Sequence, residues 1–161
     1  MTTLDTVYIG YFASHIPITL AVDLMPLLPR ALVPGPLLAL NTFLTQTLRD
    51  PFMVIDDTRT DLTWFRSFLA CELVFQLPFF FYALRLLLAG SPRRHPWLAV
   101  YGAHVVTTMV PILATLAFNI TDRTVGEKLM LAMMYGPYLA IPLLMVATSL
   151  PHCLAAKAKT D

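Results

Sequence analysis

The chain has 161 residues, of which 57% are hydrophobic and only 13% are charged, and its formal net charge at pH 7 is +1. Soluble domains carry about 25% charged residues, so the composition indicates an integral membrane protein. A net charge this small gives a nucleic-acid partner no electrostatic support. The length allows about four spans of roughly 20 residues and no separate soluble domain. We therefore expect one all-α transmembrane domain with four spans over residues 1–161.

Four apolar runs of membrane length follow one another along the chain. The first has no basic segment before it and no small-residue cleavage site after it, so we interpret it as a retained helix and not as a signal peptide. The sequence predicts spans near Thr6–Leu28, Leu62–Leu88, Trp97–Asn119 and Gly126–His152. Aromatic residues near the expected span ends, namely Tyr8, Tyr11, Trp64 and Trp97, are candidates for anchors at the membrane interface.

Every expected span contains at least one proline: Pro17, Pro78, Pro111, Pro137 and Pro142. Proline removes a backbone donor and kinks a helix. The kinks either serve packing alone or let the four helices bow apart around a cavity. The polar residues described below favour the cavity, so we predict a bundle of four proline-kinked transmembrane helices.

The first connection, residues 29–61, is long enough to hold an element of its own. Its segment GPLLALNTFLTQTLRD predicts a short amphipathic helix in the first lumenal loop, which either lies at the membrane interface or caps the bundle. The two cysteines, Cys71 and Cys153, lie in different spans. We expect no disulfide between them and no metal site, because nothing has metal-ligand spacing.

The chain's orientation is not decided by charge, because the basic residues divide almost evenly between the two sides. The C-terminal sequence KAKTD gives a better indication. It places Lys157 and Lys159 at the spacing of a dilysine retrieval signal, which is read in the cytosol. We therefore expect a multi-pass protein of the endoplasmic reticulum membrane with both termini cytosolic.

Two carboxylates interrupt the apolar spans. With the N-terminus cytosolic, Asp23 would lie roughly 8 Å and Glu72 roughly 12 Å inside the lumenal edge of the membrane. Thr19 is one helical turn before Asp23, and Gln76 is one turn after Glu72. Ionisable groups at such depth are costly and mark functional sites.

The third and fourth spans supply polar residues for the same lumenal half of the bundle. His104 and Thr108 lie one turn apart, and Tyr135 and Tyr138 lie roughly 12–16 Å from the start of their span. We expect these residues to converge with the two carboxylates. For His15, a role in bridging helices is favoured over a functional one.

Two neighbouring carboxylates in a low dielectric cannot both stay ionised. We expect one proton to be shared or held by Glu72, which leaves Asp23 as the anion. An anion among aromatic and aliphatic side chains is a receptor for a cationic amine, and the apolar remainder suits a lipophilic or steroid-shaped body. The alternative is a structural hydrogen bond that joins two helices.

Several strings of the sequence are familiar. SHIPITL and CELVFQLP, together with VYGAHVVTTMVPILATLAF and MMYGPYLAIPLL, resemble the sigma-2 receptor family. That family belongs to the EXPERA group, which includes the emopamil-binding sterol isomerase. The resemblance implies a four-helix protein of the endoplasmic reticulum, a homodimer, that binds sterols and cationic amphiphiles and is tied to cholesterol homeostasis.

The resemblance also implies roles for individual residues. Asp23 matches the acidic residue that pairs with ligand amines, and Glu72 matches its protonated neighbour. Three positions match polar residues around the pocket, namely Gln76, Thr108 and Tyr138. His15 matches a supporting position.

The sequence as a whole predicts a non-enzymatic membrane protein that binds sterols and cationic amphiphiles and acts in lipid homeostasis. We expect no catalytic residue, cofactor or metal, and we expect the lipid bilayer, a second copy of the chain and lipid-trafficking membrane proteins as partners. One alternative is a sterol isomerase, with Asp23, Glu72 and His104 as acid and base groups. The other is a factor in membrane-protein trafficking or biogenesis.

Overall fold

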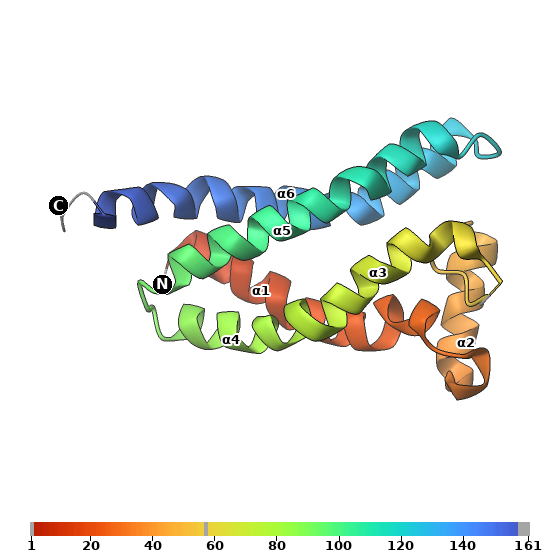
Figure 1. Cartoon of the computed structure of the whole chain (residues 1–161), viewed down its shortest axis with the longest axis horizontal. Coiled ribbons are helices and arrows are strands. Elements are labelled where there is room, and N and C mark those ends of the chain that lie inside the picture. The colour runs from red at the N-terminus through yellow and green to blue at the C-terminus, as the bar shows by residue number, and fades with distance from the viewer. Residues whose placement is uncertain (1, 57, 158–161) are drawn as a thin grey trace. The chain divides into compact units, whose positions relative to one another are not determined.

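A computed structural model describes residues 2–56 and 58–157, with the side chains of 156 and 157 outside the description. Every regular element in these residues is a helix (Figure 1). The α-helices are α1 (Thr3–Ile18), α2 (Gly35–Thr42), α3 (Thr63–Cys71), α4 (Leu77–Leu88), α5 (Arg94–Ala114) and α6 (Val125–Lys157). The predicted all-α class is confirmed.

Four continuous helical stretches are long and apolar enough to cross a membrane. They run over Thr3–Leu27, Thr60–Leu88, Arg94–Asn119 and Val125–Ala155, within a few residues of the predicted spans. Large apolar side chains stand exposed along them, such as Phe75 at 65% and Val100 at 64% exposure. Such a surface suits contact with lipid, because soluble proteins rarely expose apolar side chains along several whole helices.

Three of the four stretches contain a π-helical segment close to a proline. The segments are Thr19–Asp23, Glu72–Gln76 and Thr115–Asn119, and the nearby prolines are Pro17, Pro78 and Pro111. In each segment the closing backbone N–H donates to the carbonyl five residues before it, for example Leu24 to Thr19 and Leu77 to Glu72. Proline disturbs the usual helical register, so the local widening has a physical cause. The predicted kinks of the helix axes stay a prediction.

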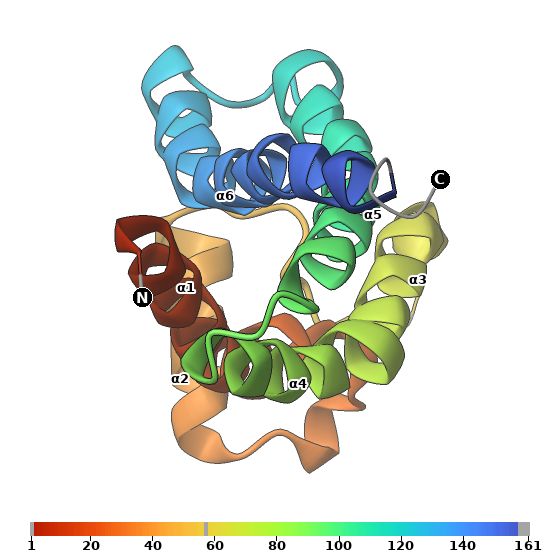
Figure 2. The ribbon, with the colours of Figure 1, turned by 90° about the vertical axis from the view of Figure 1, so that its left-hand side faces the viewer.

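The described residues cluster into two compact units. The first contains the described parts of Met1–Ala13 and Phe81–Asp161, and the second is Ser14–Phe80. In the first unit, α5 and α6 lie side by side, as Figure 1 and Figure 2 both show. Gly102 on α5 makes this approach possible, because a Cβ there would lie 2.5 Å from the carbonyl oxygen of Pro142 and 2.8 Å from Cγ2 of Val146.

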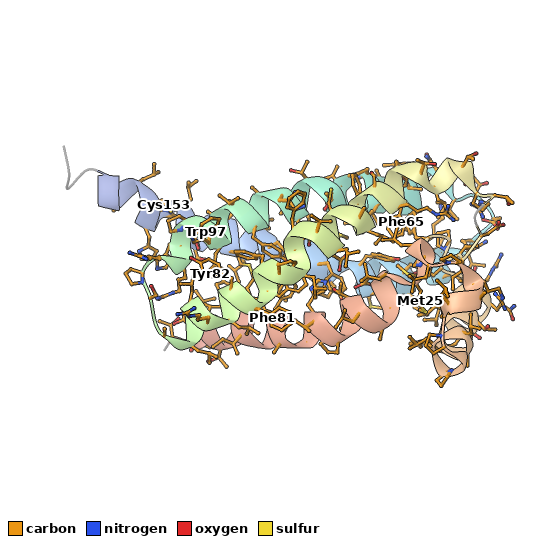
Figure 3. All side chains as sticks on the ribbon, turned by 60° about the horizontal axis from the view of Figure 1, so that its bottom comes forward. Met25, Phe65, Phe81, Tyr82, Trp97 and Cys153 are labelled. Atoms are coloured by element: carbon orange, nitrogen blue, oxygen red, sulfur yellow. The ribbon has the colours of Figure 1, made fainter. Side chains whose placement is uncertain are left out.

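A tight connection joins α4 to α5 in the first unit. Gly90 has a φ of +60°, and the N–H of Ser91 donates to the carbonyl of Leu86. This arrangement is a Schellman motif, which ends a helix with glycine in the left-handed conformation. Next to the connection, the rings of Tyr82 and Trp97 meet edge to face at 5.6 Å (Figure 3). The turn therefore fixes where α5 begins.

In the second unit, the first connection packs on α3. The ring of Phe52 stacks on Phe65 at 4.9 Å, and Met25 and Phe65 are both buried (Figure 3). The predicted short helix is present as α2 and continues as a π-helical segment, Phe43–Thr47. Its inward face is not purely apolar, since Asn41 is buried and its Nδ2 donates to the carbonyl of Met53 at 2.6 Å.

Two of the four expected interface anchors have a different role. Tyr8 is 3% exposed and Tyr11 is 7% exposed, so both are core residues. The hydroxyl of Tyr8 bonds to that of Thr148, and the hydroxyl of Tyr11 bonds to that of Tyr101. Buried tyrosines find such partners because an unsatisfied hydroxyl is costly. Trp97, by contrast, is exposed, as an anchor requires.

Candidate functional site: a carboxylate cluster on two membrane-length helices

Glu72 is the centre of a polar cluster in the second unit. Its Oε1 accepts a hydrogen bond of 2.6 Å from the hydroxyl of Thr19 and lies 3.6 Å from Nε2 of His15. Thr19 is fully buried, and the side chains of His15 and Glu72 are only 7% and 13% exposed. The cluster therefore joins two membrane-length helices through polar contacts that are shielded from water.

Asp23 belongs to the same cluster. The ligand atoms of His15, Asp23 and Glu72 all lie within 4.8 Å of one another. Two carboxyl groups this close in a low dielectric repel each other when both are ionised, so we expect the pair to share one proton and to carry one negative charge. The structure brings the two carboxylates close together, as the sequence predicts.

The immediate surroundings of the cluster are aromatic and amide groups. The imidazole of His15 packs against the ring of Phe80 with centroids 4.8 Å apart, and Phe80 is fully buried. Gln76 is 7% exposed and lies one turn after Glu72. Few water molecules can screen a charge in such surroundings, so the net charge of the pair acts strongly on a neighbouring cation.

The local helix geometry explains why these residues come together. Thr19 and Asp23 are the first and last residues of one π-helical segment, and Glu72 and Gln76 are the first and last residues of another. A π-helical turn widens the helix and re-aims its side chains, and such turns recur at functional sites. The polar residues of both spans therefore sit where the regular helix is interrupted.

The donor set is suited to a cation. One imidazole nitrogen and two carboxyl groups within 4.8 Å resemble the ligands of a divalent metal ion, and they also match an ammonium group. The sequence predicts no metal ion, whereas the chemistry of these ligand atoms fits either cation.

The remaining predicted site residues belong to the first unit. The hydroxyl of Thr108 donates to the carbonyl of Val105 at 3.0 Å, so it can only accept from a ligand. The ring of Tyr138 lies 6.3 Å from that of Tyr11. His104 and Tyr135 are half-buried on α5 and α6. The ligand-binding roles of these four residues stay predictions.

Thr19 stands out in the sequence only by its spacing from Asp23, yet it is the hydrogen-bond donor to Glu72. The helical spacing of four residues was the one signal that could have assigned it. The predicted retrieval signal lies outside the described residues, because Lys159 and the side chain of Lys157 are not described.

Comparisons with known proteins agree with the resemblance in the sequence. The EXPERA family (EXPanded EBP superfamily) matches residues 36–149. Human sigma intracellular receptor 2 is 40% identical over 148 residues, which cover 84% of this chain and 81% of the human protein. The protein of the same name from Xenopus tropicalis is 38% identical over 156 residues, covering 91% and 88%.

A third relative has a different kind of name. Efficient mitochondria targeting-associated protein 19 of Schizosaccharomyces pombe is 35% identical over 150 residues, covering 88% of this chain and 72% of the yeast protein. The family match includes Glu72 and Gln76 and begins after Asp23. Four membrane-length helices, the family match and these identities agree, and the chain belongs to the EXPERA family as a relative of sigma intracellular receptor 2.

Proposed function

We propose that this chain is a receptor-like protein of the endoplasmic reticulum membrane that binds cationic amphiphiles and sterols and acts in sterol and lipid homeostasis. The observation that supports it best is the proximity of Asp23 and Glu72, which lie on two membrane-length segments and which we expect to carry one negative charge between them. The name of the human and Xenopus relatives supports a receptor-like role.

Each member of the cluster has a distinct part in this function. Asp23 is the counter-ion of the ligand ammonium group. Glu72 is the neighbour of that counter-ion and is held in place by the Thr19 hydroxyl, which donates to it at 2.6 Å. His15 packs on Phe80 and lies 3.6 Å from Oε1 of Glu72, so it supports the position of the pair. The sterol body needs no charge, and we expect it to lie against the apolar side chains of the same helices.

The experiment is to purify the chain in detergent and to identify the lipids that remain bound by mass spectrometry. We expect a sterol, and we expect a cationic amphiphile to displace it while the uncharged analogue of that amphiphile does not. Treatment with a chelator should leave the displacement unchanged. A preparation that carries no sterol and shows no displacement would contradict this function, and loss of displacement after chelation would indicate a metal ion in the cluster instead.

The same preparation tests the enzymatic alternative. A buried acid beside a base could move a double bond in a sterol, and His15, Asp23 and Glu72 supply both types of group. We expect sterols incubated with the protein to be recovered unchanged. Appearance of an isomer, lost in Glu72→Gln, would assign the chain to the isomerases.

A role in membrane-protein targeting is the second candidate, and the name of the yeast relative favours it. Such a role would depend on partner proteins and not on the carboxylate pair. Affinity purification of the chain and of its Asp23→Asn variant separates the two functions. Equal recovery of the same membrane proteins with both variants would support targeting, and a second copy of the chain in the complex would support the predicted homodimer.

A further inference from the structure

A second polar site lies in the first unit and shares no residue with the carboxylate cluster. There a cavity of about 220 Å³ is enclosed by the start of α1, the start of α5 and the last third of α6. Figure 1 shows these three helix ends together at one end of the unit. The polar residues of its wall are Thr2, Asp5, Tyr8, Arg94, His95, Thr148, Ser149 and His152.

The acidic group of this wall already has its partners. Oδ2 of Asp5 accepts a hydrogen bond of 2.8 Å from the N–H of Thr2, and Oδ1 lies 3.2 Å from Nε of Arg94. The N–H of Asp5 in turn donates to the hydroxyl of Thr2, which completes a capping box at the start of α1. Asp5 therefore contributes structure to the wall and does not call for a cationic ligand.

The wall of the cavity contains hydrogen-bond donors without an acceptor among the described residues. Arg94 directs Nε to Asp5, and its Nη1 donates to the carbonyl of Ser91 at 3.0 Å. The hydroxyl of Ser149 is buried, with the residue 1% exposed, and it has no hydrogen-bond partner within the described part of the chain. A buried unsatisfied hydroxyl is costly, so it indicates a group that fills the cavity.

Two histidines add to the donor side of the cavity. The rings of His95 and His152 are stacked with centroids 4.0 Å apart, and Nδ1 of His95 is buried without a partner among the described residues. The cavity also lies at the N-terminus of α5, a helix of 21 residues, where the helix dipole favours an anion. A ligand with several acceptor oxygens and a negative charge would satisfy all of these groups at once.

The position of the cavity in the spans indicates where the ligand comes from. Asp5 and Arg94 lie within the first three residues of their spans, and His152 lies within the last four of its span. These residues are therefore at the depth of the lipid headgroups. Leu4 lines the cavity and is exposed, and Leu154, two residues after His152, is exposed as well, so both offer apolar surface for acyl chains.

We propose that this cavity binds the phosphate group of a membrane lipid, with Arg94, Ser149 and the His95–His152 pair as its donors. Arg94 supplies the positive charge and remains held by Asp5. The guanidinium and hydroxyl groups suit phosphate oxygens, which accept several hydrogen bonds at once. The site is separate from the carboxylate cluster and does not depend on the function proposed above.

The test uses the purified full-length chain in detergent and short-chain phosphatidic acid as the probe. Inorganic phosphate and the diacylglycerol with the same chains, each at the same concentration, are the two comparison ligands. Bound lipid is counted by native mass spectrometry, and affinity is taken from the rise in unfolding temperature. We expect binding of phosphatidic acid that clearly exceeds that of both comparison ligands.

The variant Ser149→Ala makes the test specific. It removes a hydroxyl that has no partner, so the fold should not lose stability, while the affinity for phosphatidic acid should fall by about tenfold. Ser67→Ala, at an exposed serine of α3 whose hydroxyl donates to the carbonyl of Trp64, should change nothing. Cationic amphiphile binding should be the same in both variants.

Each other outcome overturns the assignment. Equal binding of inorganic phosphate would mean a site for free phosphate and not for a lipid. Equal binding of diacylglycerol would mean that only acyl chains are recognised. Binding of phosphatidic acid that is unaffected by Ser149→Ala would place the lipid elsewhere, and no binding at all would leave the cavity to water.

Discussion

The hydroxyl of Thr19 donates a hydrogen bond of 2.6 Å to Oε1 of Glu72, and it joins two membrane-length helices at their carboxylates. Thr19 is fully buried, so water cannot replace this bond if it is lost. Hydrogen bonds to charged or polar groups gain strength in such a low dielectric. The orientation of the whole acidic cluster therefore depends on one small side chain.

Thr19→Val should test this dependence. The substitution keeps the shape of the side chain but leaves the Glu72 oxygen without its donor, which costs about 1–3 kcal/mol. We expect a lower unfolding temperature in detergent and a weaker affinity for cationic amphiphiles. Thr107→Val is the matched control, because that hydroxyl is exposed and donates to the Ala103 carbonyl of its own helix. Equal behaviour of the two variants would contradict a special role of Thr19.

Substitutions of Glu72 should reveal its protonation state. If Glu72 holds the proton of the pair, Glu72→Gln keeps a hydrogen-bond donor next to Asp23 and should weaken amine binding only slightly. Glu72→Ala removes the donor to Asp23 and also the acceptor of the Thr19 hydroxyl, so it should weaken amine binding more than Glu72→Gln does. Binding isotherms of the two variants give the comparison. Equally poor binding by both would mean that Glu72 acts as an anion.

The contact between α5 and α6 should be sensitive to the size of residue 102. A Cβ added at Gly102 would lie 2.5 Å from a backbone oxygen of Pro142, so Gly102→Ala must push the helices apart. We expect a loss of about 1–3 kcal/mol, seen as a lower unfolding temperature. Gly136→Ala on α6 is the control, because a Cβ added there would meet nothing within 4 Å, so this change should be neutral or stabilising. A neutral Gly102→Ala would contradict the close packing of this pair.

The all-α fold class and the four spans could be predicted from the sequence because their physical cause is simple. Apolar runs of membrane length leave few alternatives to a helix, and the helix bounds followed within a few residues. The meeting of Asp23 and Glu72 was predictable for a related reason, since their depths are similar. Helical spacing also indicated Thr19 and Gln76 as neighbours of the two carboxylates.

Other features depend on contacts between residues far apart in the sequence. Tyr8 and Tyr11 look like interface anchors by position, and only the partners Thr148 and Tyr101 show that they are core residues. The π-helical segments could not be predicted, because periodicity of this length does not distinguish them from an α-helix. The polar cavity is lined by Asp5, Arg94 and Ser149 from three distant parts of the chain, so no local sequence motif could predict it.

Replacement of both Lys157 and Lys159 by alanine should release the protein from the endoplasmic reticulum. The spacing of these lysines at the C-terminus is the reason, and ligand affinity should not change. Imaging should use a tag at the N-terminus, because a tag at the C-terminus would hide the signal. If the double variant stays in the endoplasmic reticulum, the lysines are not the signal. Protection of the C-terminus from protease added to the cytosolic side would show that the predicted orientation is inverted.

The most direct measurement is the affinity of the Asp23→Asn variant for a cationic amphiphile in detergent. The amide has the size of the carboxyl group but lacks the charge that an ammonium group needs in a low dielectric. We expect a loss of about 3–5 kcal/mol, which is more than ~100-fold in affinity, with the fold intact by unfolding temperature. Asp122→Asn, at a 68% exposed side chain, should bind as the unchanged chain does. If Asp23→Asn retained full affinity, the carboxylate cluster would not be the amine site.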